Sequence, residues 1–303
     1  MAPAVIPVPA FAGMTLKNYC EMKKTLTIGY SPCPNDTFIF YALIHGKVEV
    51  TGIEFRERLE DVETLNRMAL EGALDITKIS YHALGHLRER YALLRSGGAL
   101  GRGCGPLVVA RPGTRLSDLR HGAVAIPGRL TTAWLLLRLF EPSIANVSVM
   151  PFDRIMDAVS DGSAAAGLII HESRFTYPRY NLDKLLDLGV WWENFSGLPI
   201  PLGGILGKRS LGSDVLVRVE AAIRQSVRYA RKNPDEVLDY CRKHSQEMDM
   251  AVMQSHINLY VNDFSLDLGP EGLEAVKRLF AEAESRGVFP HVDRPLLAEG
   301  ETV

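Results

Sequence analysis

Short apolar runs alternate with amphipathic stretches along the first two thirds of the chain. Five runs have the apolar or alternating pattern of strands: Leu26–Tyr30, Ile53–Glu57, Asp75–Ser80, Gly122–Ile126 and Val147–Met150. Stretches with apolar residues at helical spacing follow most of them, as in Asp61–Leu70. This alternation of strand and helix predicts an α/β fold.

The apolar run Ala164–Ile170 has seven residues and ends directly before His171. Its length is short for a helix and typical of a strand buried on both faces of a parallel sheet. Ligands of open α/β sheets bind at the carboxyl ends of strands, so we expect His171 where a general base would meet a substrate. The alternative is a structural histidine whose hydrogen bonds are satisfied within the fold.

The first strand is followed by Ser31–Asp36, a segment with two prolines that predicts a turn. Asn35 and Asp36 are expected to cap a helix through Phe38–Ile44. Beyond Ser213 the pattern is helical, and Asn233–Glu236 has the form of a capping box with proline at the first helical position.

Strands followed by a helical tail predict two α/β lobes between which the chain crosses twice, near Arg111 and near Leu202. The larger lobe is expected to combine residues 23–111 and 203–303, and the smaller lobe to contain residues 112–202. The ligand would bind in the cleft between them.

The first 22 residues contain three prolines and no basic residue before Lys17, which is a poor signal peptide. We expect residues 1–22 to be a disordered tail or a mis-assigned start. No later apolar run approaches the roughly 20 residues that span a bilayer. A cytoplasmic protein without a membrane segment is therefore expected.

The composition is that of an ordinary globular protein, with 47% apolar and 23% charged residues among 303. A net charge of −2 provides no basic field for nucleic acid or an anionic membrane. The four cysteines are scattered, without the C-x-x-C spacing of a zinc, iron–sulfur or redox site. A small molecule is the expected partner.

Two further patterns argue against common cofactors. The glycine-rich segment Gly97–Gly105 lacks the G-x-G-x-x-G spacing of a dinucleotide site, so its glycines are expected to approach a ligand closely or to form a mobile turn. His82 and His86 have the spacing of zinc ligands on a helix, but no glutamate follows His82 and no third ligand is evident. We expect no metal.

The candidate binding residues lie near strand ends. Thr131 and Thr132 begin a helix after Pro127-Gly128, where unpaired N–H groups and hydroxyls suit a carboxylate or phosphate, although threonines there are equally often plain caps. Lys78 is the cation that we expect in the cleft. The alternative is that Lys78 is a solvated surface lysine.

Several of these segments together resemble a known family, the 1,4-dihydroxy-6-naphthoate synthases of the futalosine route to menaquinone. The resemblance runs from about Lys24 into the C-terminal helices and rests on long motifs: Ser31–Phe38, Asp61–Asn66, Gly97–Gly103, Gly167–Tyr177 and Pro199–Gly204. It implies a two-lobed fold like type II periplasmic solute-binding proteins, with two crossovers and a helical C-terminal segment.

The resemblance also implies an activity. It implies a lyase that converts cyclic dehypoxanthine futalosine to 1,4-dihydroxy-6-naphthoate, with release of a three-carbon sugar fragment and without metal or redox cofactor. The family's proton acceptor matches His171, and its ligand-binding positions match Lys78, Ile79, Ser80, Thr131 and Thr132. The rival hypothesis is a transport-associated binding protein that captures a small organic anion without chemistry.

Overall fold

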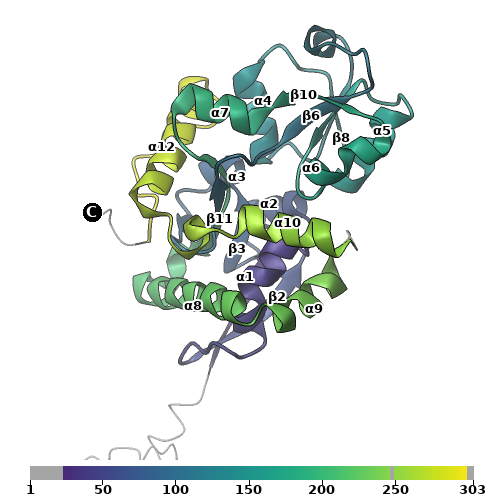
Figure 1. Ribbon diagram of the computed structural model, residues 1–303. Helices are drawn as coiled ribbons and strands as arrows, with labels where there is room; N and C mark the ends of the chain where they lie inside the picture. Colours follow the sequence, from purple (N-terminus) through teal and green to yellow (C-terminus); the bar gives the residue numbers. More distant parts are fainter. Residues whose placement is uncertain (1–22, 246–248, 299–303) are drawn as a thin grey trace, which may run out of the picture.

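The computed structural model of the protein describes residues 23–245 and 249–298. Figure 1 shows two α/β lobes, with the C-terminal helices packed around the larger one. The expectation for residues 1–22 lies outside the described residues. Within the described part of the chain, no helix is both long and apolar enough to cross a membrane.

The larger lobe is built on a mixed sheet. Among the described residues its strands are β1 (Lys24–Tyr30), β2 (Ile53–Leu59), β3 (Ile76–Ser80), β4 (Tyr91–Leu93), β5 (Ala99–Gly101) and β11 (Ile200–Lys208). The order is β2-β1-β3-β11-β4, and β5 also pairs with β11. The first three strands are parallel, whereas β11 runs antiparallel to its neighbours.

Helices from both ends of the chain cover this sheet. They are α1 (Pro34–Ile44), α2 (Val62–Glu71), α3 (Tyr81–Gly85), α8 (Ser213–Lys232), α9 (Pro234–His244), α10 (Met250–Tyr260), α11 (Asp263–Leu266) and α12 (Gly269–Ser285). Ten residues of α1 are buried because α8, α9 and α10 all pack against it. The C-terminal helices thereby fix the segment that follows β1.

The smaller lobe contains the strands β6 (Leu107–Ala110), β7 (Val124–Ile126), β8 (Val147–Val149), β9 (Ala166–Ile169) and β10 (Asp183–Asp187). Their order is β10-β6-β9-β7-β8. Its helices are α4 (Thr132–Phe140), α5 (Ile155–Ser160), α6 (Ser173–Thr176) and α7 (Leu188–Ser196). It also contains short 3-10 helices at Leu116–Arg120, Phe152–Arg154 and Tyr177–Tyr180. Another 3-10 helix, Arg209–Leu211, lies in the larger lobe.

The prediction of a fully parallel strand before His171 was wrong in two respects. The strand β9 has four residues where the apolar run has seven, and it pairs parallel with β7 but antiparallel with β6. All four of its residues are buried, which explains why the sequence lacks an alternating pattern there.

The strand Leu107–Ala110, which we placed in the larger lobe, pairs with β9 and β10 of the other sheet. The first crossing therefore lies between β5 and β6, in the glycine-rich segment, and not near Arg111. Gly105 in this crossing has a φ of +128°, and an added Cβ would lie 3.0 Å from the Gly189 backbone. Only glycine fits such a conformation without strain.

Two predicted helix caps were wrong. Helix α1 begins at Pro34 with Cys33 as its N-cap, so Asn35 and Asp36 lie inside the first turn, and proline at that position is compatible with a helix. Asn233 precedes α9 but makes no side-chain cap; its amide donates to the carbonyl of Tyr229.

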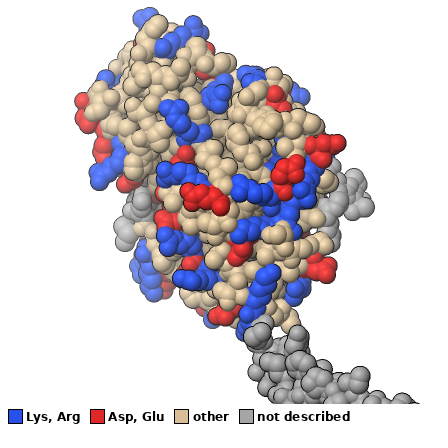
Figure 2. All heavy atoms as spheres, turned by 180° about the vertical axis from the view of Figure 1, so that it is seen from behind, with Lys and Arg blue, Asp and Glu red and all other residues tan. Residues whose placement is uncertain are grey.

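Figure 2 shows lysine and arginine interspersed with aspartate and glutamate over one face of the molecule. No single-sign field covers that face, in keeping with the net charge of −2. The absence of nucleic-acid partners stays a prediction.

Candidate active site

A pocket lies between the two lobes and contains about 700 Å³ of empty space, its open mouth included. The parallel strands β1 and β3 of the larger lobe, and β7 and β9 of the smaller lobe, each lead into segments that line it. The remaining wall comes from the start of α2, from β5 and the crossing after it, from β11 and from α10. The sheets thus bring four strand ends to one cavity, as their topology requires.

Lys78 is a buried residue of this pocket and not a solvated surface lysine. Its side chain is 5% exposed, and Nζ lies 2.6 Å from Oδ1 of Asp36. The other carboxylate oxygen, Oδ2, accepts hydrogen bonds from the backbone N–H and the hydroxyl of Ser31. An ammonium has three hydrogens, so Lys78 retains donor capacity toward a ligand.

His171 lies two residues beyond β9 in a left-handed backbone conformation, with φ of +56°. This turns the chain sharply and brings the imidazole into the pocket with Ile170. The ring of Phe152 meets it in an edge-type contact, with 4.9 Å between centroids. Burial lowers the pKa of His171 to about 4; the charge of Asp36 opposes the shift and that of Lys78 adds to it. The imidazole is therefore neutral near pH 7 and able to accept a proton.

The other four candidate binding residues also line the pocket, but their polar atoms are not equally free. Ser80 at the end of β3 exchanges two hydrogen bonds with Asn66, and Ile79 beside it contributes an apolar wall. The hydroxyl of Thr132 donates to the carbonyl of Leu202 at 2.6 Å.

Thr131 is the N-cap of α4. Its hydroxyl accepts from the backbone N–H of Trp134 and donates to the carbonyl of Gly128. The capping role that the sequence left open is thus the one that its side chain fulfils. The N–H of Leu130 donates to the carboxylate of Glu63, which reaches across from α2. An anion at this helix start would be bound by the backbone N–H groups of residues 132 and 133.

We expect Thr131→Val to lower the free energy of unfolding by about 1 kcal/mol, since the N-cap hydrogen bond is lost while the shape is kept. Urea denaturation measures this change. The same substitution at the exposed Thr51 should leave stability unchanged. Equal effects at both sites would show that the cap contributes nothing.

Three histidines with lowered pKa values should make the fold sensitive to acid. Burial lowers the pKa of His82 and of His171 to about 4 and that of His256 well below its usual range. Between pH 6.5 and 4 the unfolded chain would bind protons that the folded protein does not. Stability is therefore complete above about pH 6.5 and falls below it, by up to about 1.4 kcal/mol per pH unit for each histidine.

Urea unfolding between about pH 7.5 and pH 5.5 tests this expectation, because most carboxylates remain ionised over that range. A free energy of unfolding that stays constant down to pH 5.5 would contradict the neutral state of these histidines.

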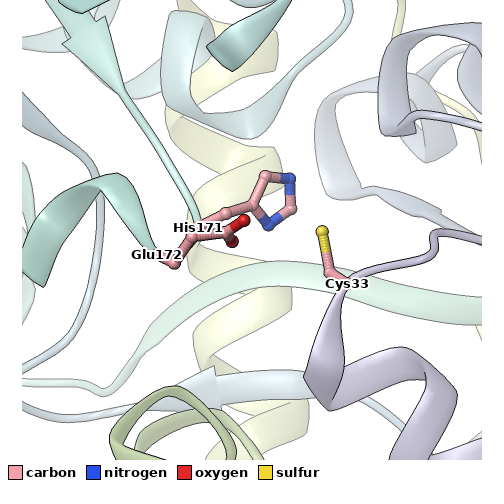
Figure 3. A group of neighbouring side chains, drawn as sticks. All are labelled: Cys33, His171 and Glu172. Atoms are coloured by element: carbon pink, nitrogen blue, oxygen red, sulfur yellow. The ribbon is translucent and has the colours of Figure 1, made fainter. Parts of the chain in front are cut away.

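The donor atoms of Cys33, His171 and Glu172 lie within 4.8 Å of one another (Figure 3). Within residues 23–245 and 249–298 this is the group that could hold a metal ion. Burial, and then the carboxylate of Glu172, raise the pKa of the Cys33 thiol, so a thiolate ligand is disfavoured there. A bound cation would also occupy the imidazole of His171. His82 and His86, which have the sequence spacing of zinc ligands, lie with their ring centroids 5.6 Å apart. Among the described residues they belong to no group of three or more possible metal ligands.

Sequence reasoning missed several residues of the pocket. Asp36 and Asn35 were interpreted as caps, although the position of Asp36 directly after a strand and turn is that of a site residue. His256 and Tyr260 come from α10, a helix whose pattern shows no separate apolar stripe and which therefore gave no signal.

Solved structures share this architecture. A protein from Archaeoglobus fulgidus matches with 38% identity and a TM-score of 0.83, over 88% of this chain and 98% of that one. The periplasmic aliphatic sulphonate-binding protein SsuA of Escherichia coli matches with 12% identity and a TM-score of 0.62, over 92% and 95%. The predicted periplasmic-binding-protein-like fold is thus confirmed.

Sequence relatives are more specific. The model of a family described as menaquinone biosynthesis matches residues 26–285. A 1,4-dihydroxy-6-naphtoate synthase of Thermus thermophilus is 56% identical over 90% of this chain and 99% of its own length, and one of Streptomyces coelicolor is 47% identical over 90% and 98%. Together with the two-lobed fold and its interlobe pocket, these matches show that the chain belongs to the menaquinone-biosynthesis family of 1,4-dihydroxy-6-naphthoate synthases.

Proposed function

We propose that the protein is a carbon–carbon lyase that cleaves cyclic dehypoxanthine futalosine to 1,4-dihydroxy-6-naphthoate and a three-carbon sugar fragment. The observation that carries the proposal is the neutral imidazole of His171 in a pocket that also holds the cation of Lys78. A base and an anion-binding group in one cavity are what cleavage beside a hydroxyl of a carboxylated substrate needs.

In this mechanism the substrate carboxylate lies toward Lys78 and the N–H groups at the start of α4. His171 removes the proton of the hydroxyl next to the bond that breaks. The oxygen that has lost the proton forms a carbonyl on the three-carbon fragment as the carbon–carbon bond breaks, and the bonding electrons move into the ring. Aromatisation of the ring draws the cleavage forward, and protonated His171 returns the proton to the naphthoate. A positioned base of this kind contributes roughly 10² to 10⁴ in rate. No metal or redox cofactor takes part in the proposed step.

The competing function is capture of an organic anion without chemistry, which the likeness to a sulphonate-binding protein favours. Incubation of the purified protein with cyclic dehypoxanthine futalosine, followed by mass spectrometry, separates the two. The proposal predicts equal amounts of the naphthoate and a three-carbon product. Recovery of the compound unchanged from a complex with the protein would favour the binding protein.

A further inference from the structure

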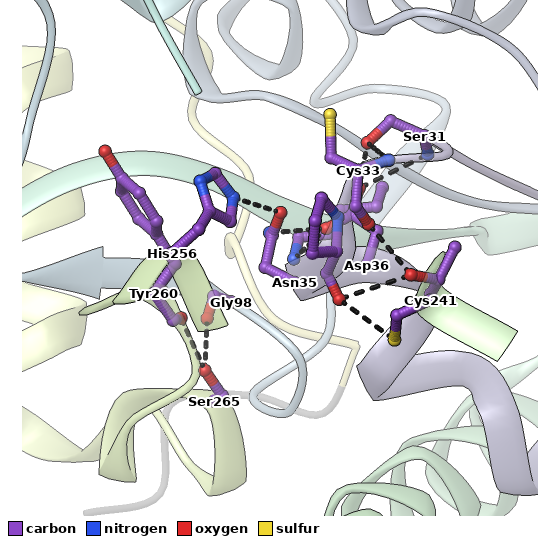
Figure 4. A network of polar contacts seen from close by, with 12 residues as sticks. Ser31, Cys33, Asn35, Asp36, Gly98, Cys241, His256, Tyr260 and Ser265 are labelled. Carbon is purple, nitrogen blue, oxygen red and sulfur yellow. Dashed lines mark hydrogen bonds and ion pairs between the residues drawn. The ribbon is translucent and has the colours of Figure 1, made fainter. Parts of the chain in front are cut away.

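His256 on α10 is a buried pocket residue that the mechanism above does not use. Its side chain is 1% exposed, and its ring lies 6.3 Å from that of His171 and 4.7 Å from that of Tyr260, measured between centroids. Figure 4 shows the ring between Tyr260 and Asn35. His256 therefore lies beside the proposed base, and its hydrogen bonds determine what its ring can do there.

The network around Asp36 determines which nitrogen of His256 carries hydrogen (Figure 4). The Asp36 carboxylate, paired with Lys78, can only accept, so the group of Asn35 that lies 2.7 Å from Oδ1 is the amide NH₂. The Asn35 oxygen therefore faces His256, whose Nε2 lies 2.9 Å away and must be the donor. Asn35 is in this way held between a carboxylate and an imidazole.

The other nitrogen, Nδ1, is then a bare acceptor. Burial lowers the pKa of His256 well below its usual range, and the neighbouring His171 and Lys78 lower it further. The ring is accordingly neutral, with its one N–H hydrogen on Nε2. Nδ1 is buried and has no hydrogen-bond partner among the described residues. Leaving a buried acceptor unpaired is unfavourable, so a donor from a ligand would stabilise the arrangement.

We propose that Nδ1 of His256 accepts a hydrogen bond from a hydroxyl of the substrate and so holds that part of the molecule beside His171. This assignment rests on the proposed function and adds a residue to it. A neutral acceptor selects a hydroxyl and rejects a carboxylate, whereas Lys78 and the N–H groups at the start of α4 favour a carboxylate. These different preferences within one pocket constrain the direction in which a carboxylated, hydroxylated substrate binds.

Nitrogen-15 NMR of histidine-labelled protein at about pH 7.5 tests the tautomer directly. His256, identified by loss of its signals in His256→Gln, is expected to show hydrogen on Nε2 and none on Nδ1. His82 is the internal control, because its Nδ1 lies 3.2 Å from the carbonyl oxygen of Thr131 and must donate. A hydrogen on Nδ1 of His256, or a charged ring, would overturn the inference whatever the substrate is.

The contact with substrate is tested in the His171→Asn variant, in which cyclic dehypoxanthine futalosine should bind while turnover is strongly reduced. Binding is expected to shift the Nδ1 resonance of His256 as it accepts a hydrogen bond and to leave the His82 signals in place. If the compound binds and Nδ1 does not respond, the inference is wrong although the proposed function stands. If wild-type protein neither binds nor converts the compound, the proposed function fails. The tautomer measurement still tests whether Nδ1 of His256 is an acceptor.

Kinetics provide a second readout. His256→Gln keeps an amide donor for Asn35 but has no acceptor where Nδ1 stood, so KM should rise roughly tenfold or more while kcat changes little. A purely structural histidine would alter the unfolding midpoint and leave KM unchanged, which would contradict the assignment.

Discussion

Replacing His171 by asparagine is expected to lower turnover by about 10² or more while substrate still binds. Asparagine has a polar side chain but cannot take the proton at neutral pH. The fold should survive because His171 has a φ of +56°, and asparagine is among the few residues that tolerate this left-handed conformation. Steady-state kinetics and a dissociation constant from calorimetry measure both quantities.

His121 offers a matched control, since it is an exposed histidine of the same lobe. His121→Asn should leave turnover and binding unchanged. Near-normal turnover in His171→Asn would exclude the base role. Loss of binding together with turnover would make His171 a residue that holds the substrate or the fold.

Replacing Lys78 by methionine is expected to cost about 3–5 kcal/mol of unfolding free energy, because it leaves the buried carboxylate of Asp36 without its cation. Both side chains are less than a tenth exposed, and the ion pair is 2.6 Å long. The remaining donors of Ser31 and Asn35 would compensate only in part. Substrate affinity should fall as well, since the proposed carboxylate site loses its positive charge.

Lys47 pairs with Glu236 at 2.9 Å on the surface, where both side chains are about 40% exposed. Lys47→Met is therefore the control, and an exposed pair of this kind contributes less than about 1 kcal/mol. Denaturant unfolding of the two variants under the same conditions measures the contrast. Equal losses of unfolding free energy in the two variants would show that the buried ion pair of Asp36 and Lys78 contributes no more than the exposed pair.

The sequence predicted the parts of the fold that local patterns determine. The apolar run before His171 identified a buried strand, although β9 ends two residues before His171. The switch from strands to helices near Ser213 identified the C-terminal segment. Because ligand sites of α/β sheets follow the strand ends, the same pattern located His171, Lys78 and Thr131 in one pocket. These residues lie far apart in the sequence but adjacent in the topology.

What sequence reasoning missed depends on long-range packing. Asp36 was read as a cap because aspartate near a helix start usually caps it, whereas tertiary contact with Lys78 gives it a buried partner. Nothing local marks His256, which reaches the pocket only because α10 packs against α1. Strand direction was also open to error, since a run buried on both faces looks the same in a parallel and in a mixed sheet.

The central claim is that neutral His171 starts the cleavage as a base, and the pH dependence of kcat/KM tests it most directly. Brief pH-jump assays keep the protein folded while the rate is read. A base with a pKa of about 4 predicts that kcat/KM is constant from about pH 8 to pH 5.5 and falls as the pH drops through about 4. A rate that instead rises as the solution becomes more acidic would contradict the claim, because it would require the protonated imidazole.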